Sequence, residues 1–193
     1  MLQGRPYQAN DPELSTERTR AKTLVYEYNN LHPENAEAGK ALLKGLLGKT
    51  GKAFHIEAPF RADYGYNITL GENFYSNYNL IILDCAPVFI GDNVFIAPNV
   101  SICTAGHPIH HEPRIAGYEH AFPVTIGNNV WIGAHTVINP GVTIGDNTVI
   151  GSGSVVTRDI VAGCVAVGNP CRPVRQITDA DRDHYLEELN VPG

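Results

Sequence analysis

A repeat of six residues constrains the fold of this chain more than any other feature of its sequence. Written in sixes from Val88, the chain reads VFIGDN, VFIAPN and VSICTA, then breaks off and resumes at Val124 for six further units. The third position of every unit is aliphatic: Ile90, Ile96, Ile102, Ile126, Ile132, Ile138, Ile144, Ile150 and Val156. Neither a helix nor an alternating strand has this period, whereas a hexapeptide parallel β-helix does. We therefore predict an all-β core in which three units form one coil of eighteen residues.

The repeat also predicts how the coils pack. Each aliphatic third position lies over its equivalent in the next coil, so these side chains fill the axis of the solenoid. Glycines that follow this position, such as Gly91, Gly127 and Gly145, suit tight corners where a side chain would obstruct the turn. A β-sandwich would instead need strands spaced about 8–12 residues apart, and we reject that alternative.

Two insertions break the register of the repeat. An earlier, irregular coil begins at Ile68, and two extra residues precede Val88, so we expect residues 84–87 to bulge out of the coil. The longer insertion covers residues 106–123 and separates two in-register coils. A loop extruded from a solenoid is usually functional or disordered. This loop is rich in histidine and carries His107, His110, His111 and His120.

Helices are predicted on both sides of the repeat. Apolar residues at three- and four-residue spacings predict a helix within residues 13–31 and a second helix over about 35–47. These helices are expected to pack beside the solenoid or to cap its end. Near the other end of the chain, Thr178 is a suitable N-cap for a short terminal helix. We divide the chain into an N-terminal helical segment (1–53), a β-helix with its extruded loop (54–170) and a C-terminal tail and helix (171–193).

The composition argues against several classes of protein. The chain has 14 Lys and Arg against 20 Asp and Glu, and its net charge of -6 disfavours a nucleic-acid or anionic-membrane partner. The N-terminus lacks the pattern of a signal peptide, and no apolar run approaches the roughly 18–20 residues that span a bilayer. The four cysteines form no CxxC pair, which fits reduced thiols. We expect a cytoplasmic protein.

The sequence CTAGHPIHH, from Cys103 to His111, gathers the most reactive side chains of the chain. A histidine, with an ordinary pKa of about 6.5, suits general-base chemistry near neutral pH. The H-x-x-H-H spacing also allows a zinc site. A Cys–His nucleophile pair is a third reading, although Cys103 occupies the repeat slot that Gly91 and Ala97 hold elsewhere, which favours a small corner residue.

Further motifs carry a resemblance to a known family. DYGYNITLGENFYSNYN, TAGHPIHHEPR, the hexapeptide run from Pro123 to Ile160 and VGNPCRPVR together cover most of the chain. In these motifs the sequence resembles the maltose, galactoside and nodulation sugar O-acetyltransferases, and most of all the maltose branch. The resemblance implies a left-handed parallel β-helix, a homotrimer with active sites between subunits, and acetyl-CoA as the acetyl donor.

The same resemblance implies the catalytic residues. His107, in the GHP motif, corresponds to the general base that takes the proton of the attacking hydroxyl. Asn77 corresponds to an Asn near the acetyl group, where it can donate to the thioester or the acceptor. The family transfers acetyl directly in a ternary complex, so no cysteine nucleophile is required and Cys103 is interpreted as structural.

Donor-binding positions also follow from the resemblance. The CoA of the family runs along a groove of the coils and meets mainly backbone groups. Arg suits the phosphates because its planar fork donates paired hydrogen bonds. The matching positions here are Asn77, Ala134, Ser152, Thr157, Arg158, Arg172 and Arg175.

Acceptor-binding positions transfer as Asp11, Arg18, Asp63 and Asp84. Asp63 matches the maltose branch rather than the galactoside branch, which has Ser there. Cys85 stands where the galactoside enzymes carry a sugar-binding Asp, so the resemblance favours a maltose- or glucose-like acceptor. Asp11 and Arg18 also fit simple helix-terminal charges, and Asp84 also fits a turn.

Two other activities are compatible with a hexapeptide β-helix. The γ-class carbonic anhydrases share this fold and bind zinc through histidines at subunit interfaces, but they have no use for the arginines of the tail. An acetyltransferase with a non-sugar hydroxyl acceptor is the other alternative. We expect no metal. The roles of His110, His111 and Trp131 stay open.

Overall fold

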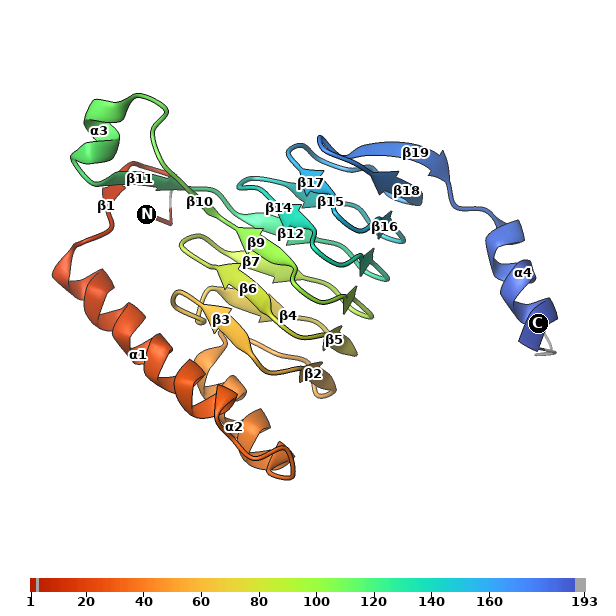
Figure 1. Cartoon of the computed structure of the whole chain (residues 1–193), viewed down its shortest axis with the longest axis horizontal. Coiled ribbons are helices and arrows are strands. Elements are labelled where there is room, and N and C mark those ends of the chain that lie inside the picture. Colours follow the sequence, from red (N-terminus) through yellow and green to blue (C-terminus); the bar gives the residue numbers. More distant parts are fainter. Residues whose placement is uncertain (3, 190–193) are drawn as a thin grey trace.

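The computed structural model of the chain describes residues 1–2 and 4–189. A parallel β-solenoid forms the body of the molecule (Figure 1). Two helices, α1 (Pro12–Asn29) and α2 (Ala36–Leu46), lie at its first coil. At its last coil the chain turns into an arm that ends in α4 (Asp179–Leu189) and projects away from the solenoid (Figure 1). The predicted β-helix with helices at both ends is therefore confirmed.

The strands of the solenoid form three faces, each named here by one strand. The β4 face contains β4 (Ile68–Leu70), β7 (Val88–Ile90), β12 (Val124–Ile126) and β15 (Thr143–Ile144). The β5 face contains β2 (Phe54–Ile56), β5 (Phe74–Ser76), β8 (Phe95–Ile96), β13 (Trp131–Ile132), β16 (Val149–Ile150), β18 (Cys164–Val167) and β19 (Arg172–Gln176). The β6 face contains β3 (Phe60–Ala62), β6 (Leu80–Leu83), β9 (Ser101–Cys103), β14 (Val137–Ile138) and β17 (Val155–Val156).

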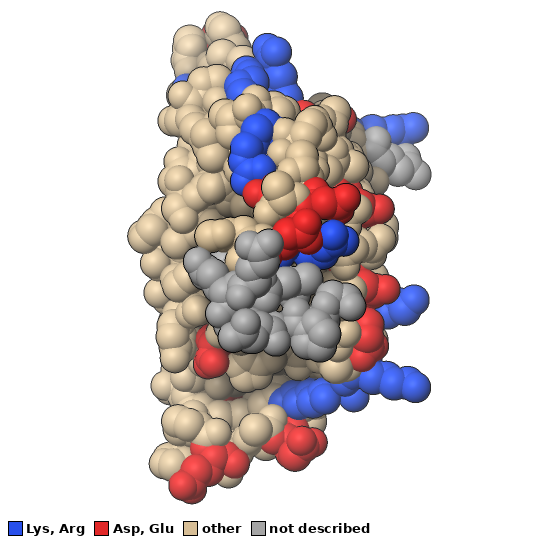
Figure 2. All heavy atoms as spheres, turned by 90° about the vertical axis from the view of Figure 1, so that its right-hand side faces the viewer, with Lys and Arg blue, Asp and Glu red and all other residues tan. Residues whose placement is uncertain are grey.

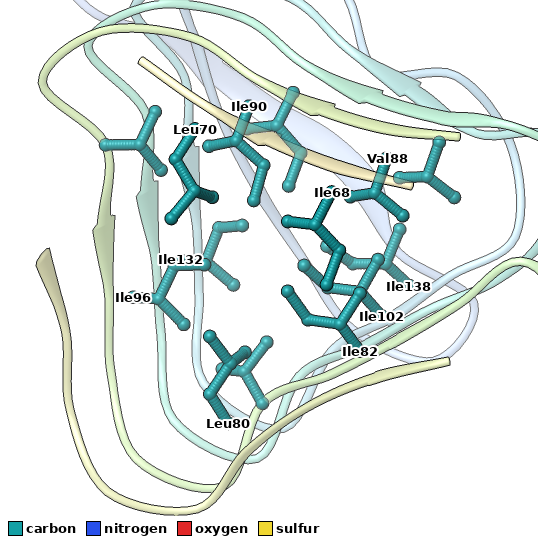
Figure 3. Packing of buried hydrophobic residues seen from close by; sticks show 14 of the residues in the cluster. Ile68, Leu70, Leu80, Ile82, Val88, Ile90, Ile96, Ile102, Ile132 and Ile138 are labelled. Carbon is teal, nitrogen blue, oxygen red and sulfur yellow. The ribbon is translucent and has the colours of Figure 1, made fainter. Parts of the chain in front are cut away.

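The aliphatic positions of the repeat stack in register along the axis. Ile90 pairs with Ile126, and Ile126 with Ile144, on the β4 face. Equivalent parallel pairs on the other two faces join Ile96, Ile132 and Ile150, and Ile102, Ile138 and Val156. Figure 3 shows five of these side chains, Ile90, Ile96, Ile102, Ile132 and Ile138, inside the triangular coil. Each of these side chains is buried, so the predicted packing is confirmed. Because burying one such side chain stabilises the fold by about 1.5–3 kcal/mol, this column is the main source of stability.

Asparagines turn the corner between the β4 and β5 faces. Asn73, Asn93, Asn129 and Asn147 all have a left-handed φ near +55°, which Asn tolerates better than most residues. Their side-chain amides also bond from coil to coil, at 3.0 Å, 3.0 Å and 2.9 Å between successive members. The same corner asparagine thus recurs in four successive coils, and its side-chain bonds help to keep these coils in register.

The N-terminal helices are fixed to the first coils by polar and apolar contacts. The side chain of Asn29 donates to the Phe60 carbonyl and accepts from the Phe60 amide, both at 2.9 Å. The Tyr28 hydroxyl donates to the Ile56 carbonyl. Leu43 and Leu46 are buried in the main core. The helices therefore close the end of the solenoid.

The extruded loop is ordered and forms a small antiparallel sheet. After β9 the chain forms β10 (Ala105–Gly106), the short helix α3 (His111–Ile115) and β11 (Tyr118–Ala121). β11 pairs with β10 on one side and with the N-terminal strand β1 (Tyr7–Gln8) on the other. The chain's N-terminus is thus fixed against the loop (Figure 1).

The insertion at residues 84–87 is covered by other segments of the chain. Residues 84–87 do interrupt the repeat, but they do not bulge into solvent: Asp84, Cys85 and Ala86 are buried. They form a second small core with Tyr64 and Ala121, because the N-terminal segment and the loop cover them. The sequence repeat alone does not show this cover, since it comes from segments distant in the chain.

The C-terminal arm begins with an antiparallel strand. β19 pairs with β18, and α4 starts directly after Thr178, as predicted. The final residues 190–193 of the predicted tail lie outside the described residues. Figure 2 shows the side of the molecule at this arm, where basic and acidic side chains are interspersed. Within the described residues, no helix is long and apolar enough to cross a membrane.

Candidate active site

The predicted site residues gather at two different corners of the solenoid. The loop corner joins the β6 face to the β4 face and includes residues 63–67, 84–87, 104–123 and 157–159. The Asn77 corner joins the β5 face to the β6 face and includes residues 77–79, 97–99, 133–136 and 151–154. Coil stacking aligns the equivalent positions within each corner.

His107 lies at the loop corner, one residue after β10. Its side chain is 60% exposed, and its Nε2 lies 3.8 Å from Oε1 of Glu119 on β11. The other carboxylate oxygen of Glu119 accepts a 2.7 Å hydrogen bond from the Tyr7 hydroxyl. The structure therefore presents an open imidazole with a sheltered carboxylate beside it, which is the form that a general base needs.

Asp63 lies below the loop in the same corner. Its carboxylate accepts a bond from the Cys85 thiol at 3.4 Å, and burial raises the pKa of the Asp63 carboxyl. Burial also raises the pKa of the Cys85 thiol to about 12, so this cysteine is a neutral partner rather than a nucleophile. Asp63 is only partly buried and can still accept hydrogen bonds from a ligand.

Asp84 has a structural set of contacts. Its residue is fully buried, and its carboxylate accepts from the backbone amides of Tyr64 at 2.8 Å and of Asp63 at 3.1 Å. A third amide, that of Asn67, donates to it at 3.3 Å. Burial raises the pKa of this carboxyl to about 6. These contacts do not support the expected direct contact of Asp84 with a sugar, because the carboxylate is enclosed.

Asp11 and Arg18 lie on α1 beside the loop corner. Asp11 caps the helix, since its carboxylate accepts from the Glu13 amide at 2.9 Å. Arg18 donates to the Tyr64 hydroxyl at 2.8 Å and to the Ala9 carbonyl at 2.5 Å. Arg18 therefore ties α1 to the segment that carries Asp63. Both residues have structural contacts, and the reading of Asp11 as a helix-terminal charge fits its cap.

The Asn77 corner collects three of the predicted donor residues. Asn77, Ala134 and Ser152 each follow a strand of the β5 face. The coil of Ala97 lies between the coils of Asn77 and Ala134, and the coil of Ser152 comes next. Backbone bonds link these coils: the Asn77 amide donates to Ile96 and the Gly153 amide to Ala134, both at 2.8 Å. The Asn77 side-chain oxygen accepts from the Tyr78 amide at 2.7 Å, which leaves its NH₂ group as a donor.

The remaining donor residues lie near the last coil. Thr157 and Arg158 follow β17 at the loop corner, and both are exposed. Arg172 and Arg175 lie on β19 and are also exposed. Arg175 already holds a carboxylate: its two terminal nitrogens bond to Asp181 of α4 at 2.8 Å and 2.7 Å. A phosphate at Arg175 would therefore compete with Asp181.

The other residues of the histidine-rich stretch have local contacts. The imidazole rings of His110 and His111 stack with their centroids 4.6 Å apart. His110 also caps α3, because its side chain accepts a hydrogen bond from the Glu112 amide. Cys103 ends β9, and burial raises the pKa of its thiol, which agrees with a structural role. Among the described residues, no group of three or more His, Cys, Asp or Glu side chains is arranged to hold a metal ion.

Sequence reasoning missed Tyr7 and Glu119. Both act through long-range pairing of β1 with β11, in which Tyr7 lies directly opposite Glu119. The only signal in the sequence was a carboxylate within the extruded loop that carries His107. Neither the repeat nor the motifs indicate that the N-terminus reaches this loop.

A hexapeptide β-helix whose extruded loop presents an imidazole, with small and polar residues along a neighbouring corner, defines the class of hexapeptide-repeat acyltransferases. The family described as "Maltose acetyltransferase hexapeptide capping motif" matches residues 1–51, and "Bacterial transferase hexapeptide (six repeats)" matches residues 123–158. Galactoside O-acetyltransferase of Escherichia coli K12 is 52% identical over 178 residues, which cover 92% of this chain and 88% of that protein.

Solved structures agree with the sequence relatives. A galactoside acetyltransferase in complex with coenzyme A superimposes with a TM-score of 0.91 at 51% identity, covering 93% of this chain and 90% of that one. A maltose O-acetyltransferase from Clostridium difficile 630 also gives 0.91 at 51% identity, covering 92% and 95%. The chain therefore belongs to the hexapeptide-repeat sugar O-acetyltransferase family, as its motifs predicted.

Proposed function

We propose that this protein transfers the acetyl group of acetyl-CoA to a hydroxyl of a maltose- or glucose-like sugar, with His107 as general base. The observation that carries the proposal is the exposed imidazole of His107, held beside the Glu119 carboxylate on an ordered loop. Family membership supports the donor, because a relative with 51% identity is a complex with coenzyme A.

His107 carries the one proton that moves in the reaction. As the sugar oxygen attacks the thioester carbon, the imidazole takes the hydroxyl proton, which makes a poor nucleophile reactive. When the tetrahedral intermediate collapses, the carbon–sulfur bond breaks and the imidazolium gives its proton to the CoA sulfur. The NH₂ group of Asn77 is the candidate donor to the developing oxyanion, a contribution worth roughly 2.7–4 kcal/mol in measured cases.

The donor groove follows from the stacked residues of the Asn77 corner. Ala134 and Ser152 are small, so a pantetheine chain can approach their backbone groups closely. Thr157, Arg158, Arg172 and Arg175 lie at the last coils, where the arginines can meet the nucleotide phosphates. No metal ion is needed for these steps.

Asp63 is the best-placed acceptor ligand. Its carboxylate is partly buried in the corner that carries His107, and a carboxylate accepts well from vicinal sugar hydroxyls. Beside Asp63 this chain has the neutral thiol of Cys85, at the position where the resemblance places a sugar-binding Asp in the galactoside enzymes. This difference favours a maltose- or glucose-like acceptor over a galactoside. Arg18 and Asp84 then support this subsite indirectly, because both form hydrogen bonds to Tyr64, the residue after Asp63. Asp11 supports it by capping the start of α1.

We propose that the active unit is a homotrimer whose sites lie between copies. Asn77 and His107 lie at different corners of one prism, so a second copy is needed to bring them together. The β5 face offers an apolar stripe for such contacts: Phe95 and Trp131 are 52% and 55% exposed and lie side by side in register. Exposed aromatic residues of this kind are typical of interface cores.

Steady-state kinetics test the proposed base. His107→Ala should lower kcat for acetyl transfer to maltose or glucose by about 10²–10⁴-fold with little change in CoA binding. His111→Ala is the matched control, because it removes an exposed histidine of the same loop. Near-normal turnover by the His107 variant would contradict the assignment of His107 as the general base. A panel of maltose, glucose and galactosides measures the acceptor preference.

A further inference from the structure

The Tyr7–Glu119 pair is placed to control the predicted base. Glu119 Oε1 lies 3.8 Å from His107 Nε2, yet the Glu119 side chain is 18% exposed while that of His107 is 60% exposed. The charge is thus sheltered from solvent, where its effect on a neighbouring group is less screened. The imidazole stays accessible to a substrate.

Tyr7 fixes the orientation of this carboxylate. Burial raises the pKa of the Tyr7 hydroxyl, so the hydroxyl keeps its proton and donates to Glu119 at 2.7 Å. Tyr7 and Glu119 are direct partners in the β1–β11 ladder, so backbone pairing and the side-chain bond act together.

The backbone of the loop fixes His107 from the other side. Gly106 pairs with His120, which places His107 and Glu119 one residue beyond a paired position on adjacent strands. A Cβ atom at Gly106 would lie 2.9 Å from His120 Nε2, so a side chain at this position would displace the His120 imidazole. The separation of base and carboxylate is therefore set by a three-stranded sheet rather than by a free loop.

We propose that Glu119, held by Tyr7, is a positioning residue for His107. This inference rests on the proposed function of His107 as base. When His107 takes the hydroxyl proton, the imidazolium gains a positive charge next to the carboxylate. At 3.8 Å the contact acts by charge and orientation rather than as a hydrogen bond. The proton passes only from the sugar to His107 and on to the CoA sulfur.

Glu119→Gln tests the proposal, because it removes the charge and keeps the shape. We expect kcat to fall at least about tenfold, with KM for the sugar and Kd for CoA within about twofold of wild type. Tyr7→Phe should lower kcat less, since the carboxylate remains. Glu112→Gln is the matched control: Glu112 lies 3.8 Å from His110 on the same loop, and its loss should leave kcat unchanged.

A double-mutant cycle separates positioning from other roles. In the His107→Ala background, Glu119→Gln should cause no further fall in kcat. A rise in sugar KM in both backgrounds would mean direct contact with the acceptor, and a lower melting temperature with weaker CoA binding would mean a structural role. Either result overturns the proposal, as does a normal kcat in Glu119→Gln when His107→Ala is inactive. Normal turnover in His107→Ala would instead defeat the proposed function itself.

Discussion

Three carboxylates at the loop corner, those of Asp63, Asp84 and Glu119, have different surroundings. Asp84 is fully buried among backbone amides, Asp63 is half-buried beside a thiol, and Glu119 lies between a phenol and an imidazole. We propose that these surroundings suit the three carboxylates to loop structure, acceptor binding and support of the base, respectively. Residue type alone does not separate the three roles.

The buried Asp84 makes stability depend on pH. Burial raises its folded-state pKa to about 6, above the ordinary value of about 3.9. The folded protein therefore binds more protons than the unfolded chain between these values, and this contribution to the free energy of unfolding falls as pH rises through that window. We expect the unfolding free energy of wild type, relative to Asp84→Asn, to drop by about 2 kcal/mol from pH about 4 to about 7.

Chemical denaturation of both proteins at several pH values measures this difference. Taking the difference between the two proteins cancels the contributions of the other titrating groups. A pH-independent loss of stability caused by the Asn side chain would shift the plot of this difference against pH without changing its slope. A difference that stays flat over this pH range would show that Asp84 does not titrate in the folded protein.

At the scale of elements, the C-terminal arm holds one of the proposed phosphate ligands. Asp181 of α4 occupies Arg175 with a paired contact, and both groups are exposed. Arg175 holds the pKa of Asp181 at about 2, so the pair persists across physiological pH. Because CoA phosphates would have to displace Asp181, the arm should weaken CoA binding.

Asp181→Asn should therefore tighten CoA binding. An exposed ion pair is weak, so we expect Kd for CoA to fall by at most about fivefold. Asp179→Asn, which loses a carboxylate 3.7 Å from Arg182 on the same helix, controls for the change in net charge. Calorimetric titration measures both, and equal effects of the two variants would argue against a specific role of the Arg175–Asp181 pair.

The regular elements were predictable and the covering segments were not. The repeat predicted the stacked column from Ile90 to Val156 because hexapeptide periodicity is local and each coil repeats the same environment. The helix spacings likewise predicted α1 and α2 to within a few residues. The burial of residues 84–87 and the Tyr7–Glu119 pair depend on β1 meeting β11 across most of the chain. No local pattern encodes such a contact.

At the scale of the whole molecule, the proposed site residues of one chain lie at two different corners of the solenoid. The loop corner holds Asp63 and His107, and the Asn77 corner holds Asn77, Ala134 and Ser152. A cyclic trimer joins one corner of each copy to the other corner of the next, which is a head-to-tail interface. In the proposed trimer, His107 of one copy therefore works with Asn77 of its neighbour.

Complementation between two inactive variants tests this claim most directly. His107→Ala and Asn77→Ala should each be inactive alone. When the two are co-expressed in equal amounts, the whole population of trimers should regain about a quarter of wild-type activity, because about one interface in four combines an intact His107 with an intact Asn77. Distinct affinity tags and sizing verify that mixed trimers form. Mixed trimers no more active than their parents would contradict a site shared between copies.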